Sequence, residues 1–116
     1  NIVEFDFNGL TLKMMSLELH KEVKLESKVK LLVKPSNVII SKNYIEDISL
    51  SNQTLAKIVA IENGELLSSI SLKIGDTTFE SIITKESSKR LDLQEGNIVN
   101  ILIKASDLSI LRVLHD

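Results

Sequence analysis

Four residues in the last third of the chain, Thr84, Ser87, Lys104 and Ser106, place hydroxyls and one ammonium where apolar runs end. Thr84 and Ser87 stand three residues apart at the start of a predicted helix, so both hydroxyls lie near its free N–H groups. A buried dianion needs donors around it, because an unpaired buried charge is very costly. Hydroxyls, main-chain N–H groups and one Lys beside a helix N-terminus can supply them. The pattern predicts a site for a small tetrahedral dianion.

The same residues have a purely structural interpretation. A Thr or Ser before a short helix is often only its cap, and a Lys at a strand end is often only solvated. Other chemistry is not indicated: there are two His and no Cys, and no Ser-His-Asp order or glycine-rich phosphate loop stands out. We therefore expect a non-catalytic chain without a cofactor.

Composition narrows the class of protein. The chain has 116 residues, enough for one ordinary domain or two small ones sharing a core. The net charge of −2 carries no electrostatic footprint for nucleic acid, and no run reaches the roughly 18 apolar residues of a membrane span. Aromatic residues are only 3%, so the core must be built from Ile, Leu and Val. No signal peptide opens the chain, and its start at Asn1 suggests a piece of a longer protein.

Short alternating runs predict strands separated by turn signals such as Asn8-Gly9 and Gly75-Asp76. The predicted strands are 2–7, 10–15, 28–34, 37–41, 54–63, 66–74, 77–84, 97–105 and 108–114. The stretch 85–93 is the one good helical segment, capped by Thr84 or Ser87 with Leu91 facing inward. This pattern predicts an all-β protein: an OB-like five-stranded β-barrel, a related and truncated N-terminal β unit, and one short helix.

The chain contains an internal repeat at an offset of about 70 residues. Residues 28–40 match residues 97–110, so that Lys34-Pro35-Ser36-Asn37 falls on Lys104-Ala105-Ser106-Asp107. We predict a degenerate unit over residues 1–45 and a complete unit over 46–116. The first unit lacks its opening strand, which either lies upstream or comes from a partner chain. An open barrel edge of this kind favours at least a dimer.

Residues 49–111 resemble the Mop (molybdenum–pterin-binding) family, which is grouped with TOBE domains. The motifs appear in order. They are Ser49-Leu50-Ser51-Asn52-Gln53, Ile83-Thr84-Lys85-Glu86-Ser87, Leu91-Asp92-Leu93-Gln94-Glu95-Gly96 and Ile103-Lys104-Ala105-Ser106-Asp107. The segment 33–38, Val-Lys-Pro-Ser-Asn-Val, is similar to the TOBE unit at the C-terminus of transporter ATPases. The resemblance covers just over half of the chain.

The resemblance implies small OB-type barrels that bind molybdate or tungstate where units meet. Carried over to this sequence, it implies an oxyanion site made by Thr84, Ser87, Lys104, Ala105 through its backbone, Ser106, Ser49, Ser51 and Asn52. Ser51 stands where the family has an arginine, so one cation is lost. The first unit lacks the Thr and Ser pair, since residues 16–19 read Ser-Leu-Glu-Leu. It would form only a weaker second site, with Lys34 and Ser36.

The resemblance favours a regulatory oxyanion sensor in the ATP-binding subunit of a molybdate importer. That protein would be cytoplasmic, peripheral at the inner face of the membrane, partnered with a permease and at least homodimeric. Three alternatives remain open: the effector domain of a molybdate-responsive transcription regulator, a free-standing storage protein, and a TOBE interaction or dimerisation module without ligand. Nucleic-acid binding by this chain is disfavoured, because stacking aromatics and a basic groove are missing.

Overall fold

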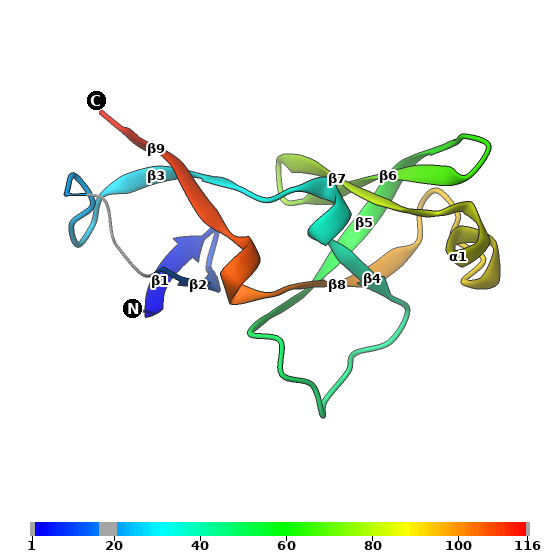
Figure 1. Cartoon of the computed structure of the whole chain (residues 1–116), viewed down its shortest axis with the longest axis horizontal. Helices are drawn as coiled ribbons and strands as arrows, with labels where there is room; N and C mark the ends of the chain where they lie inside the picture. The colour runs from blue at the N-terminus through cyan, green and yellow to red at the C-terminus, as the bar shows by residue number, and fades with distance from the viewer. Residues whose placement is uncertain (1, 17–20, 116) are drawn as a thin grey trace.

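The computed structural model describes residues 2–16 and 21–115, which form nine β-strands, one α-helix and two 3-10 helices (Figure 1). The strands are β1 (Ile2–Phe7), β2 (Leu10–Met15), β3 (Lys28–Leu32), β4 (Ile39–Ser41), β5 (Asn52–Asn63), β6 (Leu67–Ile74), β7 (Thr77–Thr84), β8 (Ile98–Ile103) and β9 (Ser109–Leu114). The helices are η1 (Pro35–Asn37), α1 (Lys85–Arg90) and η2 (Ala105–Asp107). Within the described ranges, no helix has the length and apolar character needed to cross a lipid bilayer. The predicted all-β class with one short α-helix is confirmed, although α1 is shorter than the stretch 85–93.

Five strands form one curled sheet in the order β4-β8-β5-β6-β7, and every neighbouring pair is antiparallel. β5 joins the two sides of this sheet, because its first half pairs with β8 and its second half pairs with β6. The register with β6 shifts between Ile58 and Ala60. Such an irregularity bends a strand and increases its twist, which lets β5 serve both sides of the curl. This is the OB-like, five-stranded arrangement predicted from the sequence.

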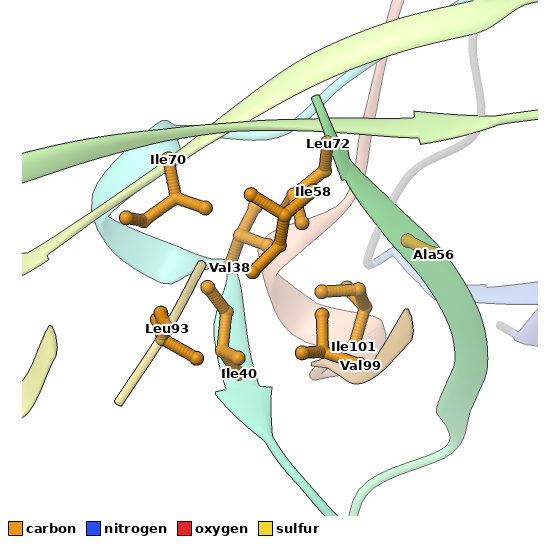
Figure 2. Close-up of a cluster of buried hydrophobic side chains, with 9 residues drawn as sticks. All are labelled: Val38, Ile40, Ala56, Ile58, Ile70, Leu72, Leu93, Val99 and Ile101. Carbon is orange, nitrogen blue, oxygen red and sulfur yellow. The ribbon is translucent and has the colours of Figure 1, made fainter. Parts of the chain in front are cut away.

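The buried core of the curled sheet is aliphatic, as the low aromatic content predicts. Nine buried side chains meet there (Figure 2): Val38, Ile40, Ala56, Ile58, Ile70, Leu72, Leu93, Val99 and Ile101. Burying a branched side chain of this size stabilises the fold by roughly 1.5–3 kcal/mol. Val38 and Ile40 belong to the first half of the chain, so the core of the second half is incomplete without the first.

The internal repeat is visible in the hydrogen bonds of the two halves. The Ser27 N–H donates to the Lys24 carbonyl at 3.0 Å, and 70 residues later the Asn97 N–H donates to the Gln94 carbonyl at 3.1 Å. The same residue pairs also share a hydrogen bond in the opposite direction. The Lys24 N–H donates to Ser27 Oγ at 2.9 Å, and the Gln94 N–H donates to Asn97 Oδ1 at 3.0 Å. Two different side chains thus close the same turn, which explains why the repeat is weak in sequence but clear in backbone structure.

The two repeats exchange their last strands. β4 follows η1 of the first repeat but pairs with β8, and β9 follows η2 of the second repeat but pairs with β3. Pairing between strands far apart along the chain cannot be read from chain order. The unit boundary between residues 45 and 46 therefore stays a prediction, and the structure adds that strand pairing crosses it in both directions.

Two polar side chains tie the halves together by buried or half-buried hydrogen bonds. Asn52 Oδ1 accepts from the Lys13 N–H at 2.7 Å, and Asn52 Nδ2 donates to the Lys13 carbonyl at 2.8 Å. Ser81 Oγ, at the middle of β7, donates to the Val38 carbonyl at 2.6 Å. Asn52 is 4% exposed and Ser81 is 0% exposed, so leaving either polar group without a partner would be costly.

Candidate functional site

Thr84 caps α1 and links three side chains at this end of the molecule. Its backbone is extended, and its Oγ1 accepts a hydrogen bond from the Ser87 N–H at 3.1 Å. The Thr84 hydroxyl also donates to Ser87 Oγ at 2.9 Å, and Arg90 donates to the same Ser87 oxygen at 3.3 Å. The capping role predicted for Thr84 is therefore confirmed. Two hydroxyls and one guanidinium form a connected group.

A surface pocket of about 220 Å³ lies between α1 and η1, and residues of both repeats line it. Its polar lining consists of Ser36 from η1 with Ser87 and Arg90 from α1, and its other lining side chains are aliphatic. We call Ser36, Thr84, Ser87 and Arg90 the η1 corner. One water needs only about 10–15 Å³ of such volume, so the pocket has room for a tetrahedral oxyanion. Among the lining residues, all within the described part of the chain, none is a carboxylate.

Arg90 is a candidate that the sequence motifs do not mark. It follows Ser87 by three residues on α1, a spacing that puts both side chains on one helix face. Its guanidinium lies 3.6 Å from Glu86, a pair in which both side chains are largely exposed. An exposed pair of this kind contributes little to stability, so the guanidinium can turn toward another anion at small cost.

The second candidate group surrounds η2. Lys104 is the exposed residue that precedes η2, and Ala105 is buried directly after it. A second pocket, of about 250 Å³, is lined by Lys34 and Asn37 of the first repeat and by Ser106, Asp107 and Ser109 of the second, together with Leu32 and Leu108. We call Lys34, Lys104, Ala105 and Ser106 the η2 corner. The carboxylate of Asp107 in this lining opposes an anion.

Of the predicted residues Ser49, Ser51 and Asn52, the first two precede β5, and Asn52 begins this strand next to the end of β8. Asn52 pairs with Ile103, the last residue of β8, which puts Ser51 beside the approach to Lys104. Ser49 and Ser51 are exposed, whereas the side chain of Asn52 is buried and bonded to the main chain of the first repeat. The Asn52 carboxamide thus links the two repeats by hydrogen bonds. Its part in oxyanion binding stays a prediction.

The predicted site residues fall into two groups at opposite ends of β8. A six-residue strand spans roughly 20 Å; α1 lies near the start of β8 and η2 follows its end (Figure 1). Ser87 shares a pocket with Ser36, while Ser106 shares the other pocket with Lys34. Within one chain, Ser87 and Ser106 line different pockets. The first unit is predicted to lack the Thr and Ser pair at residues 16–19. Residues 17–19 of this segment lie outside the described residues.

The polar groups of the η1 corner are of the types that can hold an anion. Arg and hydroxyl groups donate hydrogen bonds, and a bond to a charged group contributes about 1.5–3 kcal/mol. Molybdate, tungstate and sulfate are unprotonated acceptors at neutral pH and match such a donor set, whereas phosphate usually carries a proton and needs an acceptor as well. Over the described residues, no three His, Cys, Asp or Glu side chains gather in a way that could hold a metal ion.

Comparison with known proteins finds similarity to an importer subunit. The chain is 29% identical over 110 residues to the molybdate/tungstate import ATP-binding protein WtpC of Pyrococcus abyssi. The match takes in 95% of this chain and 32% of that protein's length.

Two solved structures share the fold. The cytoplasmic molybdate-binding protein ModG, in a form with molybdate bound, is 27% identical with a TM-score of 0.64, covering 69% of this chain and 58% of that one. A molybdate-binding protein from Sporomusa ovata is 30% identical with a TM-score of 0.55, covering 58% of this chain and all of that one. The TOBE domain family matches residues 48–110, more than half of the chain. The chain therefore belongs to the TOBE domain family.

Proposed function

We propose that this chain binds a tetrahedral dianion, molybdate or tungstate, at the η1 corner. The observation that carries the proposal is the pocket in which Ser36 of one repeat meets Ser87 and Arg90 of the other. Thr84 supports the site by fixing the Ser87 hydroxyl. The guanidinium of Arg90 supplies a cation in a structure in which Ser51 stands at the position of the family's arginine.

Three similarities support the choice of ligand. Two structural relatives are molybdate-binding proteins by name, one of them determined with molybdate bound. The third is a molybdate/tungstate importer subunit, and its match extends over nearly all of this chain. Sulfate has the same charge and geometry, so discrimination against it would depend on ion size.

The η2 corner is proposed as a weaker second site for the same ligand. Lys34, Lys104 and Ser106 offer two ammonium groups and a hydroxyl, but Asp107 lines the same pocket. A carboxylate beside an anion cancels part of the attraction of one lysine. We expect this corner to fill only at higher oxyanion concentration.

In the cell, we propose that the chain is the regulatory part of an importer's ATP-binding subunit. It spans 32% of the length of its Pyrococcus abyssi relative, so ATP hydrolysis would belong to another part of such a protein. That subunit would work in the cytoplasm against a membrane permease, as at least a homodimer. Oxyanion binding between repeats that exchange strands would stabilise one arrangement of the two halves and so report ion supply.

Isothermal titration calorimetry with molybdate, tungstate and sulfate tests the proposal directly. We expect micromolar binding of molybdate or tungstate, about −8 kcal/mol, with sulfate weaker. Absence of heat and of a thermal shift with all three ions would rule out the oxyanion function.

An interaction module without ligand is the second candidate, and Ser51 in place of the family's arginine favours it. Size-exclusion chromatography separates the two functions when it is paired with the titration. Under the oxyanion proposal, Ser87→Ala weakens the tighter binding step at the η1 corner and Lys104→Ala weakens only the step at higher ion concentration, while the oligomeric state is unchanged. A module without ligand would show a defined oligomer and no ion binding in any variant.

A further inference from the structure

The guanidinium of Arg90 is already paired with two acceptors of its own helix. Its Nη1 lies 3.6 Å from Glu86 Oε1, and its Nη2 donates to Ser87 Oγ at 3.3 Å. Both distances are long for a guanidinium, whose charge-assisted hydrogen bonds are ordinarily about 2.7–2.9 Å. The guanidinium is therefore held loosely, and Glu86 is its counter-ion within the chain.

The hydroxyl proton of Ser87 has no acceptor among the described residues. Ser87 Oγ itself accepts from the Thr84 hydroxyl at 2.9 Å and from Arg90 at 3.3 Å. A hydroxyl oxygen has two lone pairs, so both are used and only the O–H donor of Ser87 is left for a ligand. Ser87 and Arg90 thus face the pocket as donors. Glu86 is the carboxylate that competes for one of them.

Glu86 stands outside the lining of the pocket, one helical turn before Arg90. The Glu86 side chain is 88% exposed and the Arg90 side chain 63% exposed, so burial fixes neither of them. If their ion pair stays intact when a dianion binds, the carboxylate lies beside the ligand and repels it. If the guanidinium instead turns away from Glu86, the small free energy of the pair is lost. In both cases, Glu86 lowers the affinity for the ligand.

We propose that Glu86 sets the oxyanion affinity of the η1 corner by competing with the ligand for Arg90. This inference rests on the proposed function, since it concerns the same site. Glu86 acts through Arg90 and does not contact the ligand. Its effect is one of charge, so molybdate, tungstate and sulfate are weakened by the same factor. A competing carboxylate keeps the bound ion exchangeable, as a sensor of ion supply requires.

Glu86 also affects the stability of α1, in the opposite direction. It lies in the first turn of the helix, where a negative charge is favourable, and its pair with Arg90 has the i,i+4 spacing that stabilises helices. Glu86→Gln should therefore lower Tm slightly while it raises oxyanion affinity. A residue with a structural role alone would lower Tm and lower affinity or leave it unchanged.

Calorimetry with molybdate on Glu86→Gln tests the proposal. We expect binding about two- to fivefold tighter than in the parent chain at low ionic strength, with a smaller gain as salt is added. Titrations with sulfate should show the same gain. Glu4→Gln is the matched control, because it removes one exposed carboxylate from β1, far from α1 along the longest axis (Figure 1). It should leave the affinity unchanged.

Unchanged or weaker binding in Glu86→Gln would overturn the proposal, and so would an equal gain in Glu4→Gln. Absence of binding in the parent chain would overturn the proposed function itself, so the two failures are distinguishable. The Arg90→Gln background gives a further readout. There, Glu86→Gln should improve binding less than in the parent chain, because no guanidinium remains to compete for. An equal improvement would indicate general charge repulsion and contradict the competition.

Discussion

The second repeat closes its aliphatic core under five strands, whereas the first repeat holds the same strand types in two separate pairs. The difference lies in one element, β5, which is the only strand of the curled sheet that bonds to both β6 and β8. Similar backbone turns and 3-10 helices occur in both repeats, so these local features do not require the central strand. Burial does require it, as the half-buried face of β3 shows.

The η1 and η2 corners give a second comparison within the molecule. Each combines residues of both repeats because β4 and β9 are exchanged. The pocket of the η1 corner is lined by a guanidinium and hydroxyls, and the pocket of the η2 corner is lined by one lysine and a carboxylate. Under the oxyanion proposal, these few side chains set the difference in affinity between the two corners. The following variants test both comparisons.

The largest effect should come from matched truncations in the two β-strands that carry the repeat. Ile101→Ala leaves a cavity in the closed core and should lower the free energy of unfolding by about 3 kcal/mol. Leu31→Ala, at the equivalent half-buried position of the 116-residue chain, should cost only about 1 kcal/mol. Urea denaturation measures both values. Equal losses would show that the first repeat has a core as complete as the second.

Substituting one cation at each corner shows whether the η1 corner or the η2 corner binds molybdate more tightly. Arg90→Gln removes a charged donor from the η1 corner and should weaken molybdate binding about 10- to 100-fold. Lys34→Gln, at the η2 corner, should change the tighter binding step by less than about threefold, because Asp107 already offsets its charge. Calorimetry on both variants gives the ranking. A larger loss with Lys34→Gln would reverse the assignment of the stronger site.

The two side chains that link the repeats also differ. Asn52 makes two hydrogen bonds to the other repeat, whereas Ser81 makes one. Asn52→Ala leaves the backbone N–H and the backbone carbonyl of Lys13 without their partner and should cost about 2 kcal/mol of stability. Ser81→Ala loses one bond to the Val38 carbonyl and should cost about 1 kcal/mol. Thermal unfolding of the two variants compares them. If Asn52→Ala instead leaves stability unchanged and removes oxyanion binding, Asn52 contacts the oxyanion and does not stabilise the junction of the repeats.

The smallest effect concerns the helix cap that supports the η1 corner. Thr84→Ala should lower stability by about 1 kcal/mol, because the Ser87 N–H loses its acceptor. Thr84→Ser keeps an oxygen in place and serves as the control. Oxyanion affinity should fall in Thr84→Ala and be largely retained in Thr84→Ser. Identical affinities in both would remove Thr84 from the site.

Much of the local structure follows from short sequence patterns. Alternation predicts the strands, Asn8-Gly9 predicts the first hairpin, and Thr84 before a polar, helix-forming stretch predicts the start of α1. The 3-10 helices after β3 and β8 carry no comparable signal, since three residues are too few for a periodic pattern. Arg90 escapes notice for a different reason: its importance depends on η1 lying opposite α1, which no local pattern records.

By itself the sequence determined the strand and turn positions, the aliphatic nature of the core, the repeat at 70 residues and the donor groups suited to an oxyanion. Only the tertiary structure decided that β4 and β9 change places, that Ser87 shares a pocket with Ser36 and not with Ser106, and that Asn52 is hydrogen-bonded to Lys13. The physical reason is that periodicity and turn preferences act over a few residues. Strand exchange, in contrast, is settled by which distant edges bury the most apolar surface and satisfy the most backbone groups.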